Sequence, residues 1–98
     1  MPIDTIVGNP EAFKRSEDLD AYLENLRAYE AKYQCEAGIL KMQNRQLGAI
    51  YYVYPKLEAE TLLRKPITAS TPEIPIKFYS IADLEKLQEA LFSEKNSL

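Results

Sequence analysis

The sequence predicts a small α+β domain that occupies all 98 residues. Three features predict it: an amphipathic helical stripe near the N-terminus, an aromatic β-branched run at 49–54, and an alternating strand that leads into a capped helix. We expect a long N-terminal helix, a short antiparallel sheet with strands near 49–54 and 74–79, and a C-terminal helix at 81–94. Residues 1–8 and 95–98 are the parts most prone to fray.

An apolar stripe at helical spacing predicts the N-terminal helix. It is formed by Leu19, Tyr22, Leu23, Leu26, Tyr29 and Tyr33. Glu17, Asp18 and Asp20 crowd the first turn, where the helix dipole stabilises negative charge. These signals indicate a helix from about 17 to 33.

The end of this helix is open between two alternatives. Five apolar residues lie seven positions apart, which favours a single helix from 17 to 47, closed by Gly48: Leu19, Leu26, Tyr33, Leu40 and Leu47. Gly38 disfavours a helix by about 1 kcal/mol. The alternative is a hairpin with strands near 35–42 and 47–54. We favour the long helix.

The two strands and the last helix carry clearer local signals. Residues 49–54 are apolar or aromatic on both faces, which is typical of a central strand covered on both sides. Residues 74–79 alternate, and Pro75, which cannot donate to a ladder, places this strand at an edge. Ser80 and Asp83 have the spacing of a capping box that begins the last helix.

Shorter segments carry weaker signals. Pro2 to Val7 fits a short strand, and Asn9-Pro10-Glu11 has the pattern of a helix start. Residues 56–65 fit either a short helix or a strand. Prolines bracket a predicted loop at 68–73.

The residue inventory argues against catalysis. The chain has no His, the commonest general base and metal ligand, and Cys35 stands alone. The three glycines lie too far apart for a phosphate-binding loop. We predict a protein that is not an enzyme and has no metal site and no cofactor, with Cys35 as a buried apolar residue.

Composition also bears on location. No apolar run approaches the roughly 18 residues of a membrane span. The N-terminus lacks the basic and apolar segments of a secretory signal, and a single Cys excludes an internal disulfide. We expect a cytoplasmic protein that does not bind a membrane.

Tyrosine is the enriched residue type that could form a binding surface. The chain has seven Tyr and no Trp, and tyrosines serve both in small cores and in protein interfaces. We predict a regulatory or adaptor domain that acts by binding another protein, as an inhibitor, an assembly factor or a subunit of a complex. Its candidate contact residues are Tyr22, Tyr29, Tyr33, Leu40, Leu47, Tyr51, Tyr52 and Tyr54.

Charge distribution supports an alternative hypothesis. The chain has a net charge of −3, yet residues 37–79 hold six bases and three acids, a net +3. Bases beside tyrosines on a strand can hold single-stranded nucleic acid. The alternative function is therefore nucleic-acid binding, through Lys41, Arg45, Lys56, Arg64 and Lys65.

The long helix predicts a homodimer. A helix from 17 to 47 would be about 46 Å long, whereas a compact domain of this length is about 33 Å across. Its apolar stripe would extend beyond its own core, and a two-fold dimer is the commonest way to cover such a surface.

Overall fold

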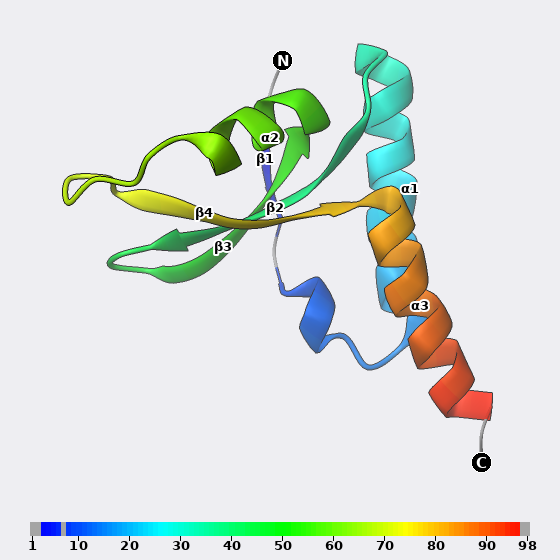
Figure 1. Ribbon diagram of the computed structural model, residues 1–98. Helices are drawn as coiled ribbons and strands as arrows, with labels where there is room; N and C mark the ends of the chain where they lie inside the picture. Colours follow the sequence, from blue (N-terminus) through cyan, green and yellow to red (C-terminus); the bar gives the residue numbers. More distant parts are fainter. Residues whose placement is uncertain (1–2, 7, 97–98) are drawn as a thin grey trace.

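Helices lie on both faces of a four-stranded antiparallel sheet (Figure 1). The computed structural model describes residues 3–6 and 8–96, and side chains as far as Phe92. In strand order the sheet reads β1–β3–β2–β4. The elements in chain order are β1 (Asp4–Ile6), the 3-10 turn η1 (Pro10–Ala12), α1 (Ser16–Tyr33), β2 (Ala37–Asn44), β3 (Gly48–Pro55), α2 (Lys56–Arg64), β4 (Glu73–Ser80) and α3 (Ile81–Asn96). The predicted α+β class is confirmed.

The predicted helix from 17 to 47 is wrong, because α1 ends at Tyr33. Gln34 takes a left-handed conformation with φ of 52°, and its N–H donates to the carbonyl of Glu30. The chain then forms the β2–β3 hairpin, which was the alternative. Gly48 does have a positive φ of 89°, but it follows the hairpin turn instead of ending a helix.

Local chemistry explains why the hairpin forms. The Asn44 side-chain oxygen accepts hydrogen bonds from the backbone N–H groups of Gln46 and Leu47, each at 2.9 Å, which is typical of a turn. Leu40 is fully buried in the sheet, whereas Leu47 is 76% exposed at the turn. The seven-residue spacing therefore does not reflect one continuous apolar face.

Each face of the sheet has its own apolar cluster, because successive strand residues point to opposite faces. On one face, α1 and α3 pack against the sheet, in a cluster that includes Leu19, Leu23, Leu26, Tyr29, Ile39, Tyr51, Val53, Tyr79 and Leu84. On the other face, α2 covers a smaller cluster of Leu40, Met42 and Ala59, with Tyr52, Tyr54, Leu62 and Phe78 packed around it.

Several other predictions are confirmed. β3 lies between β1 and β2 with side chains in both clusters, and β4 is an edge strand. At the start of α3, the Ser80 N–H donates to the Asp83 carboxylate at 3.0 Å, and the Asp83 N–H donates to the Ser80 hydroxyl at 3.2 Å, which completes the capping box.

The shorter segments with weaker sequence signals also form regular structure. Residues 56–64 are helical, and Asn9 accepts a hydrogen bond from the Glu11 N–H at the start of η1. Of the predicted strand Pro2–Val7, residues 4–6 form β1, while Pro2 and Val7 lie outside the described residues. The fraying expected at the two ends falls partly on residues 1–2 and 97–98, which also lie outside them.

Candidate functional site: the groove between α1 and β1

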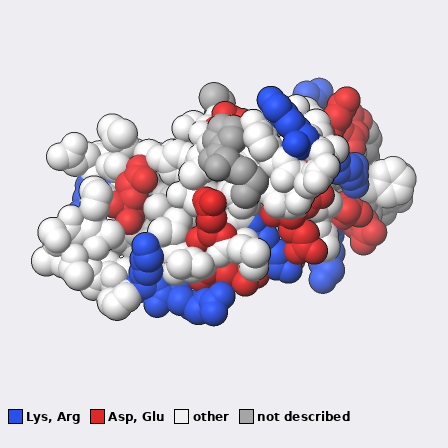
Figure 2. Space-filling view, turned by 90° about the horizontal axis from the view of Figure 1, so that it is seen from above, with Lys and Arg blue, Asp and Glu red and all other residues white. Residues whose placement is uncertain are grey.

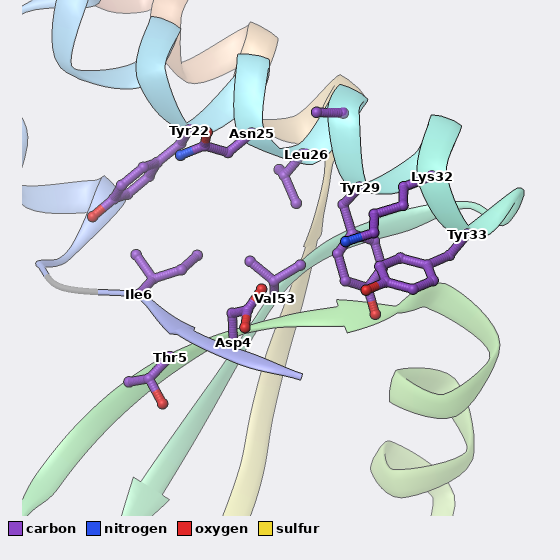
Figure 3. A pocket seen from close by; sticks show the side chains of 11 residues that line it. Asp4, Thr5, Ile6, Tyr22, Asn25, Leu26, Tyr29, Lys32, Tyr33 and Val53 are labelled. Atoms are coloured by element: carbon purple, nitrogen blue, oxygen red, sulfur yellow. The ribbon is translucent and has the colours of Figure 1, made fainter. Parts of the chain in front are cut away.

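A groove of about 450 Å³ runs between α1 and the edge strand β1. One wall is α1, which contributes Tyr22, Asn25, Leu26, Ala28, Tyr29, Lys32 and Tyr33. The floor and the other wall are formed by β1 and by Val53 of β3. Figure 3 shows Tyr22, Leu26 and Tyr29 of α1, and Ile6 and Val53 of the sheet, pointing toward the space between them, whereas Thr5 points away from it.

The sequence places the tyrosines on this wall through helical periodicity. Leu19, Leu23 and Leu26 form the buried stripe of α1, at 2% exposure or less. Tyr22 and Tyr33 are displaced around the helix from that stripe and are only half-buried. An amphipathic helix thus has its leucines in the core and two of its tyrosine rings on the rim of the core.

The chain runs in opposite directions in α1 and β1 along the groove. Tyr22 lies near Ile6 at one end, while Tyr29 lies near Asp4 toward the other (Figure 3). The charge of Asp4 contributes to a raised pKa of Tyr29, which is consistent with this proximity, although desolvation by burial is the main cause. Burial also raises the pKa of Tyr22. Both hydroxyls are therefore neutral at physiological pH.

The groove has an apolar end and a polar end. At the first, the rings of Tyr22 and Phe13 lie 5.1 Å apart, and Tyr22 lies close to Ile6 (Figure 3). At the second, the rings of Tyr29 and Tyr33 lie 4.7 Å apart. There the Lys32 ammonium lies 5.3 Å from the centre of the Tyr33 ring.

The polar end also holds the charged groups of the groove. Lys32 and Asp4 line it, and neither forms an ion pair with a residue that the structure describes. A cation lying over an aromatic ring and a nearby carboxylate on the floor can each contact a polar ligand group.

The predicted protein-contact residues lie in different parts of the structure. Tyr22, Tyr29 and Tyr33 come together in the groove. Leu40 and Tyr51 are buried in the two core clusters, and the Tyr51 hydroxyl has no hydrogen-bond partner among the described residues. The others are Tyr52 and Tyr54, which lie on the α2 face, and Leu47, which lies at the hairpin turn.

Tyr52 and Tyr54 form an edge-to-face pair with ring centres 6.4 Å apart, and the Tyr52 hydroxyl donates to Glu73 at 2.8 Å. That hydrogen bond is the main reason that the pKa of Tyr52 is raised. These two tyrosines are thus part of the packing beneath α2 and β4. Cys35 is half-buried and packs against the cluster beneath α1 and α3.

Four of the five bases proposed for nucleic acid have partners within the chain. Lys41 pairs with Glu11 at 3.9 Å and lies on the same face of the sheet as Tyr51. Arg45 donates to the backbone carbonyls of Thr71 and Thr68. Lys56 pairs with Glu36 at 3.1 Å and Arg64 with Glu60 at 3.5 Å, while Lys65 lines a hollow beside α2.

These bases are spread over both faces of the sheet and the hairpin turn. On the face shown in Figure 2, Lys and Arg side chains are interspersed with Asp and Glu. No group of His, Cys, Asp and Glu within the described residues is arranged to hold a metal ion. None of the helices in that part of the chain combines the length and apolar character that crossing a membrane requires.

Sequence reasoning identified the three tyrosines of the groove but missed Lys32 and the residues of β1. The short strand was predicted, yet nothing in the local pattern indicates that it pairs with β3 beside α1. No protein family, curated protein or solved structure compared with the chain matches it.

Proposed function

We propose that this chain is a non-catalytic adaptor or regulatory domain that binds another protein through the groove between α1 and β1. The observation that carries the proposal is that Tyr22, Tyr29 and Tyr33, which are eleven residues apart at most, line one continuous groove of about 450 Å³. Tyrosine is enriched in protein interfaces because it offers a large rigid ring with a polar tip.

The chemistry of the groove supports binding instead of catalysis. The ionisable groups that line it are tyrosines, one lysine and one aspartate. The two tyrosines whose pKa values are shifted, Tyr22 and Tyr29, are shifted upward, away from the range in which a general base would work.

Site-specific photo-crosslinking tests this proposal. A benzoylphenylalanine placed at Tyr33 should form a nuclease-resistant adduct with a protein in extracts of cells that express the chain. The matched control places the same group at Leu47, which is exposed but lies at the hairpin turn. Adducts at Leu47 alone, or adducts that nuclease removes, would contradict the proposal.

Two hypotheses drawn from the sequence remain predictions. The homodimer prediction depends on a helix that extends to residue 47. Because α1 ends at Tyr33, that geometric basis is lost, and light scattering tests the dimer directly. The nucleic-acid alternative is tested by titration with single-stranded RNA and DNA at low salt. Binding there should fall steeply as salt rises, since phosphate contacts release counterions.

A further inference from the structure

The two edges of the sheet differ in how they are protected against pairing with another strand. β4 is an edge strand of eight residues, and it contains Pro75, the exposed Lys77 and a register shift opposite Lys41 and Met42. Proline, charged side chains such as lysine, bulges and a very short strand are the usual devices that block strand addition at an edge.

β1 forms the opposite edge, and its described residues, Asp4–Ile6, contain no proline, lysine or bulge; its protection is limited to its three-residue length and the carboxylate of Asp4. It pairs in continuous register with β3 on one side only, from Asp4 opposite Val53 to Ile6 opposite Tyr51. Its outer backbone groups therefore face away from the sheet. They offer hydrogen bonds to an added strand beside the tyrosine-lined groove.

The dimensions of the groove suit an extended chain. From Tyr22 to Tyr33, α1 rises by about 16 Å. An extended segment of five residues spans about the same length. In such a segment every second side chain points to the same face, so three of them would face α1.

The ends of the groove differ in what they can accept. Ile6, Leu26 and Val53 are apolar groups near the Tyr22 end and the middle of the groove (Figure 3). At the Tyr33 end, Lys32 is a cation without an ion pair among the described residues. A carboxylate is the complementary group for this cation.

We propose that an extended segment of a partner protein adds to the outer edge of β1 as a fifth strand. Two alternate side chains of the segment are apolar and pack against the half-buried Tyr22, Ile6 and Tyr33. The next alternate side chain is acidic and lies beside Lys32. The side chains between them point to the opposite face, where that of Thr5 lies, and are not selected. This inference rests on the proposed function and specifies its partner.

A displayed library of random peptides tests this inference without knowledge of the natural partner. Peptides are selected on the full chain and counter-selected on a Tyr33→Ala variant. We expect enriched sequences with apolar residues at positions i and i+2 and an acid at i+4. A Tyr33→Phe variant should retain binding, because it keeps the ring.

A matched pair of charge-reversal variants tests whether Lys32 selects the acidic side chain of the peptide. Lys32→Glu should weaken the binding of the selected acidic peptides by about tenfold or more. This is the effect of losing one charge-assisted contact of about 1.5 kcal/mol. Lys77→Glu makes the same change of charge on the β4 edge and should leave their affinity unchanged. Equal loss from both variants would overturn the assignment of the acid to Lys32.

Methylation of single peptide amides tests strand addition itself. Methylating a nitrogen that donates to β1 should weaken binding by about tenfold, and methylating the next one should have little effect. If peptides need Tyr33 for binding but keep their affinity after methylation, strand addition is overturned and the groove remains the binding site. Failure to select any Tyr33-dependent peptide, together with no adduct at Tyr33, would overturn the proposed function as well.

A second copy of the chain is a competing occupant of this edge. Light scattering that shows a dimer at micromolar concentration, with the dimer dissociated by a selected peptide, would mean that β1 pairs with another β1. That result would overturn the assignment to a different protein. A monomer of about 11 kDa supports it.

Discussion

The two faces of the sheet are covered by helices that contribute unequally to the core. α1 places four buried side chains against one face, Leu19, Leu23, Leu26 and Tyr29, and α3 adds Leu84. α2 places a single fully buried residue, Ala59, against the other. Since burial of large apolar side chains is the main favourable term in folding, the face of α1 and α3 makes the larger hydrophobic contribution.

On the face of α2, two strands approach each other closely at one glycine. Gly38 of β2 lies beneath the ring of Phe78, and an added Cβ would approach that ring to 2.5 Å and the Tyr79 carbonyl oxygen to 2.2 Å. One face thus packs large helix side chains against the sheet, whereas the other includes a position at which the strands leave no room for a Cβ.

Matched truncations of leucine should give the largest difference. Leu23→Ala on α1 should lower the free energy of unfolding by about 2–5 kcal/mol, because Leu23 is 2% exposed and its removal leaves a cavity. Leu62→Ala on α2 should cost about 1 kcal/mol, since Leu62 is only partly buried. Urea denaturation measures both, and equal losses would refute the unequal contribution of the helices.

The second prediction concerns the glycine beneath Phe78. Gly38→Ala should lower the free energy of unfolding by about 1–3 kcal/mol, because the new methyl group has no room. Gly48→Ala is the control: its Cβ meets nothing within 4 Å, but its φ of 89° costs about 1 kcal/mol of backbone strain. A larger loss at Gly48 would show that β4 can move away from β2 at low cost.

The smallest expected effect is at the junction of β4 and α3. Ser80→Ala removes one hydroxyl acceptor of the capping box and should cost about 1 kcal/mol, or about 4–8 °C in Tm. Ser80→Asp keeps an acceptor at this position and should retain most of the stability. Calorimetry on the two variants distinguishes loss of the cap from a general effect of substitution.

Much of the fold could be predicted because its signals are local. The stripe on α1, the strand at 49–54 and the pair Ser80 and Asp83 each lie within a few residues of one another. Each has a structural counterpart within one or two residues of its predicted bounds. Residues 34–47 could not be assigned in this way, because a seven-residue spacing of leucines fits a long helix and also occurs by coincidence in a hairpin.

The amino-acid sequence by itself determined that α1 has tyrosines beside its leucines and that residues 49–54 form a central strand. Only the tertiary structure decided which tyrosines act together. Side chains of adjacent strand residues point to opposite faces, so Tyr51 enters one core cluster while Tyr52 and Tyr54 pack against the other. The groove depends on β1 pairing with β3 beneath α1, and such long-range pairing depends on the packing of the whole chain, which no local pattern encodes.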